Sequence, residues 1–377
     1  MNFQKLTEYL DHLNETGVPG CDLILYQDHQ PIYRHFAGHS DEAGQVPMRG
    51  DEVYCLFSCT KLFTTCAAMQ LIEAGKLELD APVSRYLPAY ARLTVQEGDT
   101  LRPAKRVMTV RHLMSMQAGL DYDLKAPPIL ETLAAHPEGA TTRQVADAIA
   151  RKPLCFEPGE SFQYCLCHDV LGAVIEAASG QKFSDYLKEN IFLPLGMKTI
   201  SFEFTPEIRA HLCAQYQFNG QTHKPEPVER DWLGYKISPA YESGGAGLIS
   251  NVRDYALLPD ALACGGVGWT GAHILSPEMI RLWSTDQLCP EGRKVFDSWK
   301  RLGYSYALGV RTRVDTSVGG RGPLGEFGWD GAAGAWTFVD PQNHLSGFYA
   351  QHVRSFGYAF SHIHPTLRNL IYEGMGL

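Results

Sequence analysis

Ser58 and Lys61 stand three positions apart in the segment Phe57–Phe63, a spacing that can support nucleophilic catalysis. If this segment is helical, the two side chains share one face, one turn apart. At a helix N-terminus, the free backbone N–H groups favour developing negative charge. Burial would lower the pKa of Lys61 and let it accept the proton of the Ser58 hydroxyl. The alternative is a helix-capping serine followed by a solvated lysine.

This spacing is not specific by itself, because the chain contains a second copy at Ser179 and Lys182. A chain of this length is expected to hold about one such pair by chance. The second copy straddles Gly180 at the end of an expected helix, so its two side chains should not share a face. The surroundings of Ser58 therefore decide whether the first copy carries chemistry.

Six segments follow one another in the order of a known family, namely Cys55–Pro88, Met108–Leu120, Glu157–Tyr164, Leu193–Met197, Ser243–Tyr255 and Ile274–Glu278. Together they resemble the serine β-lactamase and penicillin-binding-protein family. The closest pattern is that of the class C-like branch, which includes the family VIII carboxylesterases. The resemblance runs over roughly residues 5–355 and implies a serine hydrolase that forms an acyl-enzyme on Ser58, without a metal or organic cofactor.

Tyr164 follows a Pro-Gly loop, and the resemblance implies that it faces Ser58 and Lys61. A phenol beside a lysine could act as general base and then protonate the leaving group. The alternative is a tyrosine packed between two lobes. Leu166 stands where much of the family has an asparagine that contacts a β-lactam side chain, and esterase-like members resemble this chain in having a hydrophobic residue there.

The segment Gly328-Trp-Asp-Gly-Ala332 precedes an expected strand and aligns with the family's strand motif. The resemblance implies that the N–H groups of Ala332 and Ser58 form the oxyanion hole, with Gly331 allowing close approach of the acyl group. Trp329 replaces the cation that pairs with the substrate carboxylate in penicillin-recognising members, and could line an apolar pocket instead. The alternative is a strand glycine beside a core tryptophan.

Hydrophobic periodicity and turn residues predict strands at both ends of the chain and helices between them. The expected strands are 22–26, 31–36, 304–313, 334–340 and 344–352. The expected helices are 3–16, 58–75 (amphipathic), 109–116, 142–151, 168–178, 183–190, 252–263, 276–284 and 362–372.

This order indicates an α+β fold in which the terminal strands pair across the chain. The resemblance adds a β-lactamase/transpeptidase-like fold, with an antiparallel sheet flanked by helices and an inserted, mainly helical lobe. We expect one catalytic unit over 1–377, with a sheet lobe at about 1–60 and 300–377 and a helical lobe at about 61–299. The active site should lie in the cleft between them.

The amino-acid composition limits the classes of molecule that the protein is expected to bind. Of the 377 residues, 45% are apolar and 20% charged, as in globular proteins, and the net charge is −9 with no block of Lys and Arg. These features argue against nucleic acid and anionic membranes as partners. Ten cysteines form no short-spaced framework, and Cys165, Cys167 and His168 lack the usual spacing of metal ligands.

The N-terminal segment bears on the cellular compartment in which the protein is expected. Charges at Lys5, Glu8, Asp11 and Glu15 interrupt any apolar core of a secretory signal. No apolar stretch is long enough to cross a bilayer. We therefore expect a cytoplasmic protein with reduced thiols.

The sequence thus favours hydrolysis of a small-molecule ester, with Lys61 and Tyr164 sharing the proton transfers. Acyl transfer to a small-molecule alcohol, β-lactamase or D-amino-acid peptidase activity, and a non-catalytic ligand-binding role remain as alternatives. Four aromatic residues in the loops are candidate substrate contacts: Tyr122, Tyr216, Trp232 and Tyr235. There is no Gly-x-Ser-x-Gly motif for an α/β-hydrolase nucleophile.

Overall fold

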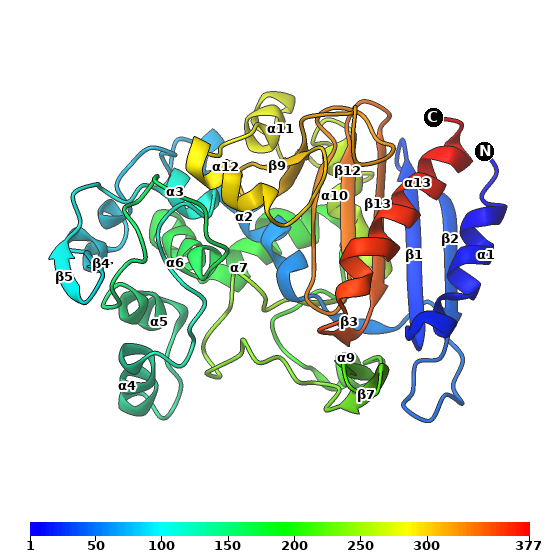
Figure 1. Cartoon of the computed structure of the whole chain (residues 1–377), viewed down its shortest axis with the longest axis horizontal. Helices are drawn as coiled ribbons and strands as arrows, with labels where there is room; N and C mark the ends of the chain where they lie inside the picture. Colours follow the sequence, from blue (N-terminus) through cyan, green and yellow to red (C-terminus); the bar gives the residue numbers. More distant parts are fainter.

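A seven-stranded antiparallel sheet forms the centre of the computed structural model, which describes all 377 residues. The N-terminal and C-terminal strands pair directly, with Ile24 opposite Phe348. Both chain termini therefore lie at the same end of the molecule, beside the sheet (Figure 1). The strand order is β2 (Gln30–Gly38), β1 (Gly20–Gln27), β13 (Leu345–Gln351), β12 (Trp336–Asp340), β11 (Phe327–Asp330), β10 (Arg311–Arg313) and β9 (Tyr304–Tyr306). The expected α+β class and antiparallel sheet are confirmed.

Both faces of the sheet are covered, and the alternation of side chains along β1 accounts for this. Leu23 and Leu25 pack toward α1 (Gln4–Asp11) and α13 (His364–Met375), whereas Ile24 and Tyr26 belong to the core on the other face. On that second face, α10 (Val252–Ala263) packs against β1, β12 and β13. Although α10 comes from the stretch expected to form the helical lobe, it is part of the sheet layer because its apolar side chains face that layer.

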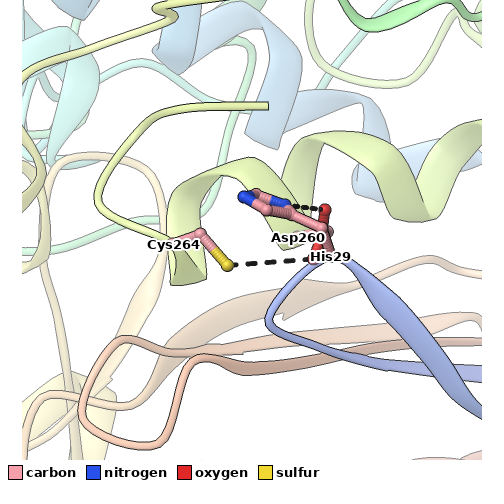
Figure 2. Close-up of side chains that lie close together, drawn as sticks. All are labelled: His29, Asp260 and Cys264. Atoms are coloured by element: carbon pink, nitrogen blue, oxygen red, sulfur yellow. Dashed lines mark hydrogen bonds and ion pairs between the residues drawn. The ribbon is translucent and has the colours of Figure 1, made fainter. Parts of the chain in front are cut away.

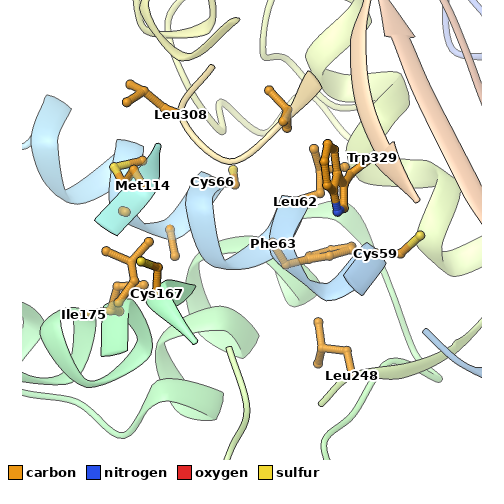
Figure 3. Close-up of a cluster of buried hydrophobic side chains, with 14 of the residues drawn as sticks. Cys59, Leu62, Phe63, Cys66, Met114, Cys167, Ile175, Leu248, Leu308 and Trp329 are labelled. Atoms are coloured by element: carbon orange, nitrogen blue, oxygen red, sulfur yellow. The ribbon is translucent and has the colours of Figure 1, made fainter. Parts of the chain in front are cut away.

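Helix α2 (Thr60–Glu73) carries Lys61 and runs through the middle of the molecule (Figure 1), where its apolar side chains pack in a buried cluster (Figure 3). Every residue from Thr60 to Met69 is buried. The expected amphipathic character over 58–75 is therefore wrong, because the sheet layer and the helical region enclose this helix on all sides. Cys59 and Cys66 pack there as small apolar side chains.

The other expected helices are present within a few residues of their predicted ends. Side-chain caps explain several starts: Thr109 and Thr141 form capping boxes, and Ser276 accepts a hydrogen bond from the N–H of Met279. These helices are α3 (Val110–Met114), α5 (Thr142–Ile149), α6 (Cys167–Ser179), α7 (Phe183–Leu187) and α11 (Pro277–Ser284).

Some elements were not predicted. Strand β7 (Lys224–Val228) contains two prolines, which argue against a strand, yet it lies at the edge of a small sheet where proline is tolerated. The expected strand 304–313 is divided by a turn at Gly309, whose φ is +99°. The remaining unpredicted helices and strands are α4 (Pro127–Ala135), α8 (Leu193–Leu195), α9 (Pro206–Ala210), α12 (Pro290–Asp297), β3 (Val53–Cys55), β4 (Thr94–Glu97), β5 (Thr100–Pro103), β6 (Gln215–Asn219), β8 (Ile249–Asn251), β11 (Phe327–Asp330) and β14 (Val353–Arg354).

All ten cysteines are free thiols. None of the helices combines the length and apolarity that crossing a membrane requires.

The tip of the β1–β2 hairpin is fixed to α10 by a polar contact (Figure 2). His29 Nδ1 lies 2.8 Å from Asp260 Oδ2, and Asp260 is completely buried. Asp28 and His29 both have positive φ, which gives the two-residue turn the twist of the flanking strands. The contact satisfies a carboxylate that would otherwise lack a strong partner.

We predict that His29 and Asp260 are energetically coupled. In a double-mutant cycle of His29→Ala and Asp260→Asn, the coupling free energy from urea unfolding should be about 1–3 kcal/mol, because His29→Ala alone leaves a buried carboxylate without this partner. The strain of alanine at the positive φ of position 29 occurs in both arms of the cycle and cancels. Additive effects of the two substitutions would contradict the expected contact.

Candidate active site

Ser58 lies in a tight turn that joins β3 to α2. The preceding residue, Phe57, has φ +47°, a left-handed conformation that is strained for an aromatic residue. The turn Phe57–Cys59 is a 3₁₀ helix that continues into α2, so the N–H of Ser58 is in a first helical turn and lacks an intrahelical acceptor. Ser58 retains 8% exposure, whereas Lys61 has none. A ligand in the cleft can therefore reach the serine but not the lysine.

Lys61 is fully buried and points at Ser58. Its Nζ donates to Ser58 Oγ at 3.2 Å and to the carbonyl oxygen of Gly245 at 2.7 Å. Burial lowers the pKa of Lys61 to about 8, and the nearby carboxylate of Asp169 opposes that decrease. About a tenth of the molecules then hold a neutral amine at pH 7, which is enough for a general base.

Tyr164 stands beside this pair, in the segment just before α6. Its ring stacks between those of Trp329 and Tyr122, with centroid distances of 5.6 and 5.9 Å. Lys61 Nζ lies 4.6 Å from the centre of the Tyr164 ring. Burial raises the pKa of Tyr164 despite hydrogen bonds with Ser58 and Trp329. The phenol therefore keeps its proton at neutral pH.

Strand β11 brings Trp329 and the following turn to the same site. Trp329 Nε1 donates to Tyr164 Oη at 3.0 Å. A Cβ at Gly331 would stand 2.5 Å from the carbonyl oxygen of Leu56, so only glycine lets this turn approach the segment before Ser58. The N–H of Ala332 has no hydrogen-bond partner within the protein. Its role with the Ser58 N–H as an oxyanion hole stays a prediction.

A cavity of about 300 Å³ connects these groups. Six of its eleven lining residues are aromatic. The lining residues are Ser58, Tyr122, Tyr164, Tyr235, Trp299, Arg301, Trp329, Asp330, Gly331, Ala332 and Phe360. A larger cavity of about 860 Å³ near α7 and α9 contains none of the candidate catalytic residues.

Some predicted contacts do not reach this cavity. Leu166 is fully buried at the start of α6 and is absent from the lining, so we no longer place it among substrate contacts. Of the four loop aromatics, Tyr122 and Tyr235 line the cavity. Tyr216 instead donates to the carbonyl of Asp41, and the ring of Trp232 packs against the guanidinium of Arg354 at 3.5 Å.

The second Ser-x-x-Lys copy is divided between two helices. Ser179 ends α6, whereas Lys182 precedes α7 and pairs with Glu242 at 2.5 Å. Cys165 and Cys167 have sulfur atoms 3.1 Å apart, and the neighbouring His168 is fully buried. Burial lowers the pKa of His168 to about 3, so this imidazole is neutral.

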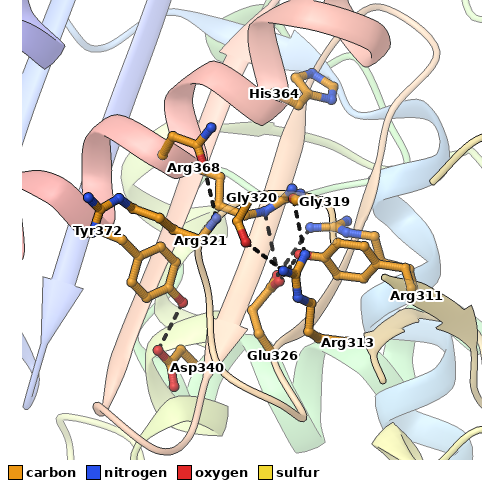
Figure 4. A network of polar contacts seen from close by, with 12 residues as sticks. Arg311, Arg313, Gly319, Gly320, Arg321, Glu326, Asp340, His364, Arg368 and Tyr372 are labelled. Carbon is orange, nitrogen blue, oxygen red and sulfur yellow. Dashed lines mark hydrogen bonds and ion pairs between the residues drawn. The ribbon is translucent and has the colours of Figure 1, made fainter. Parts of the chain in front are cut away.

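An ion network lies directly behind Trp329 and was not predicted from the sequence. Asp330 pairs with Arg301 at 2.5 Å and with the buried Arg311 at 3.3 Å. Burial alone would raise the pKa of Asp330, but the two guanidinium groups lower it to about 2. Arg311 also contacts Glu326 at 3.4 Å, within the network that ties α13 to this end of the sheet (Figure 4). No local sequence pattern predicts these ion pairs, although the charge of Asp330, between Trp329 and Gly331, indicates that an oppositely charged partner is needed there.

Comparisons with known proteins bear on the family and the fold of the chain. A family model described as Beta-lactamase matches residues 4–358. Esterase EstB from Burkholderia gladioli is 32% identical over 267 residues, which cover 64% of this chain and 65% of EstB. Acyltransferase calJ from Penicillium decumbens is 28% identical over 373 residues, covering 89% of this chain and 84% of calJ. The solved structure of EstCE1, a hydrolase with promiscuous acyltransferase activity, has a TM-score of 0.80 at 25% identity and covers 98% of each chain. The fold expected from the sequence is confirmed.

Gly331→Ala should reduce turnover because the added Cβ would push the Ala332 turn away from Leu56 and Ser58. If the N–H of Ala332 stabilises the oxyanion, kcat for a p-nitrophenyl ester should fall by about 10²–10³-fold. Gly220→Ala is the matched control, since a Cβ there meets no atom within 4 Å. Equal kcat values for the two variants, both folded by circular dichroism, would contradict this role of the turn.

Proposed function

The chain belongs to the Beta-lactamase family, and from this premise we propose that it is a serine hydrolase that cleaves small-molecule carboxylic esters through an acyl-enzyme on Ser58. The observation that carries the proposal is the buried amine of Lys61, 3.2 Å from the Ser58 hydroxyl. A lysine without any exposure has no role as a solubilising surface charge. Its lowered pKa of about 8 suits proton abstraction near neutral pH.

In the first half-reaction, Ser58 Oγ attacks the ester carbonyl carbon as its proton passes to the neutral amine of Lys61. The carbonyl oxygen becomes negatively charged, and the N–H groups of Ser58 and Ala332 are the proposed donors to it. Collapse of this intermediate breaks the bond to the alkoxy oxygen. That leaving group needs a proton, which we assign to the phenol of Tyr164, resupplied from Lys61.

In the second half-reaction, water attacks the acyl-enzyme and its proton returns through the same two side chains. The released acid restores Ser58. Trp329 supports these transfers by donating a hydrogen bond to Tyr164 Oη, which leaves the phenolic proton free to face the cleft. The cavity in front of Ser58, lined mainly by aromatic rings, suits a small apolar or aromatic acyl group.

Esters are favoured over β-lactams and D-amino-acid peptides for two reasons. By the resemblance of its motif, Trp329 stands where penicillin-recognising members of the family carry a cation, and Leu166 is buried and offers no amide to the cleft. The similarity to the esterase EstB and to the hydrolase EstCE1 points the same way.

Acyl transfer to a small-molecule alcohol is the second candidate. It shares the acyl-enzyme, and it is supported by the similarity to the acyltransferase calJ over most of both chains. The outcome depends on whether water or an alcohol reaches the acylated Ser58 first.

We also propose that the protein works in the cytoplasm. The sulfur atoms of Cys165 and Cys167 lie 3.1 Å apart beside Tyr164, as unpaired thiols. An oxidising compartment would promote a disulfide there and disturb the segment that holds Tyr164.

Ser58→Ala should abolish both labelling by a fluorophosphonate probe and turnover of p-nitrophenyl butyrate, lowering kcat at least about 10³-fold. Tyr164→Phe should lower kcat by about 10²–10⁴-fold, because the leaving alcohol loses its proton donor. Ser179→Ala, in the second Ser-x-x-Lys copy, serves as control and should label like the wild type. Intact-mass spectrometry of the labelled protein locates the adduct.

A folded wild type that neither labels nor turns over esters would overturn the hydrolase proposal. A nitrocefin rate comparable to the ester rate would overturn the preference for esters. Addition of a primary alcohol distinguishes the two acceptors: a transferase forms the new ester faster than the free acid, whereas a hydrolase releases mainly the acid.

A further inference from the structure

Asp169 is a buried carboxylate close to the catalytic pair that the proposed reaction does not use. It lies in the first turn of α6 and accepts hydrogen bonds from Tyr241 Oη and Ser243 Oγ, each at 2.5 Å. Both of these bonds go to Oδ1, and the buried Oδ2 has no hydrogen-bond partner. Since an isolated buried carboxylate oxygen is costly, its retention calls for an electrostatic partner.

The loop Ser243–Ala246 connects this carboxylate to Lys61. Ser243 Oγ donates to Asp169 and accepts from the N–H of Ala246 at 3.0 Å, which closes the loop. The carbonyl oxygen of Gly245 then accepts the hydrogen bond of Lys61 Nζ at 2.7 Å. The orientation of the lysine amine therefore depends on a loop that Asp169 holds.

Gly245 also stands directly between the two charges. A Cβ at this position would lie 2.5 Å from Asp169 Oδ2 and 3.4 Å from Lys61 Nζ. The absence of a side chain is what lets the carboxylate and the amine share this space. The adjacent Gly244 is similarly constrained, since its Cβ would lie 2.3 Å from the carbonyl oxygen of His168.

The other groups that face Lys61 are hydroxyls, thiols and an imidazole. They are Ser58 and Cys59 in the turn before α2, Tyr122, Tyr164, Cys165 and Tyr235 in the loops, and His168 on α6. Asp169 is the only carboxylate in this set, so it supplies the negative charge that a buried ammonium needs.

We propose that Asp169 is a positioning residue for Lys61: it fixes the Ser243–Ala246 loop that orients Nζ, and its charge stabilises the protonated amine between the two proton transfers. This inference rests on the proposed role of Lys61 as the base. It gives a function to the Ser243-Gly-Gly segment, which no step of the proposed reaction involves directly.

The negative charge of Asp169 should affect how kcat/KM depends on pH. A base acts in its neutral form, so kcat/KM rises as pH increases through the pKa of Lys61. Asp169 raises that pKa, opposing the larger effect of burial. Removing its charge should therefore lower the pKa and move the acid limb of the profile to lower pH.

Asp169→Asn tests this directly, because an amide oxygen can still accept from Tyr241 and Ser243 while the charge is lost. In kcat/KM profiles for p-nitrophenyl butyrate, we expect its acid limb to shift down by at least about one pH unit from that of the wild type. Ser243→Ala is the matched control: it weakens the loop but keeps the charge, so kcat should fall about tenfold while the limb stays in place.

An unmoved acid limb in a folded Asp169→Asn variant would overturn the inference, and so would an equal shift in Ser243→Ala. If Asp169→Asn does not fold, Ser243→Ala remains decisive, since an unchanged kcat would contradict the loop's role. Failure of the proposed function looks different, because the wild type itself would then show no ester turnover and no labelling of Ser58.

Discussion

A lysine side chain with no contact with water is the constraint around which this structure is organised. Burial lowers the pKa of Lys61 from 10.5 to about 8, which corresponds to roughly 3 kcal/mol of disfavoured charge. A folded protein tolerates this free-energy cost only where neighbouring groups accept the hydrogen bonds of the amine and balance its charge. The carbonyl of Gly245 and the hydroxyl of Ser58 accept its hydrogen bonds, and Asp169 supplies the opposing charge. The same environment that penalises the ammonium prepares the amine to take a proton.

Enclosing Lys61 requires segments from the whole chain to meet. From Thr60 to Met69, helix α2 is buried on every side, between the sheet layer and the helical region. The pairing of β1 with β13 joins the two ends of the chain in one sheet, and β11 of that sheet contacts the turn that carries Ser58, which places Ala332 beside it. Two positions restrict the backbone at this junction: Phe57 has a left-handed φ, and Gly331 approaches the carbonyl oxygen of Leu56 so closely that a Cβ would clash with it. Close backbone contacts therefore help to fix the position of Ser58 relative to the Ala332 turn.

Much of the fold could be predicted from local signals. The hairpin at Asp28 and His29, the helix that begins after Asn251 and the family order of the segments all lie in short stretches of sequence. The spacing of Ser58 and Lys61 indicated one helical face, and the structure brings Tyr164 and Trp329 to that face. Contacts between distant segments could not be predicted. No local sequence pattern around Asp169 indicates its hydrogen bond with Ser243, and none around Asp330 indicates its ion pair with Arg301. Leu166 was misjudged for a related reason: its neighbour Tyr164 faces the cleft, but the chain turns into α6 and buries the leucine.

The role of Lys61 as the base depends on its protonation state, which can be observed without any substrate. The protein would be labelled with ¹³Cε,¹⁵Nζ-lysine, and the Lys61 signal assigned by its loss in Lys61→Arg and followed by NMR across a pH titration. The account predicts a midpoint near pH 8, well separated from the other lysines. A midpoint near 10.5, the ordinary value for lysine, would mean that Lys61 remains charged at neutral pH and would contradict its role as the base.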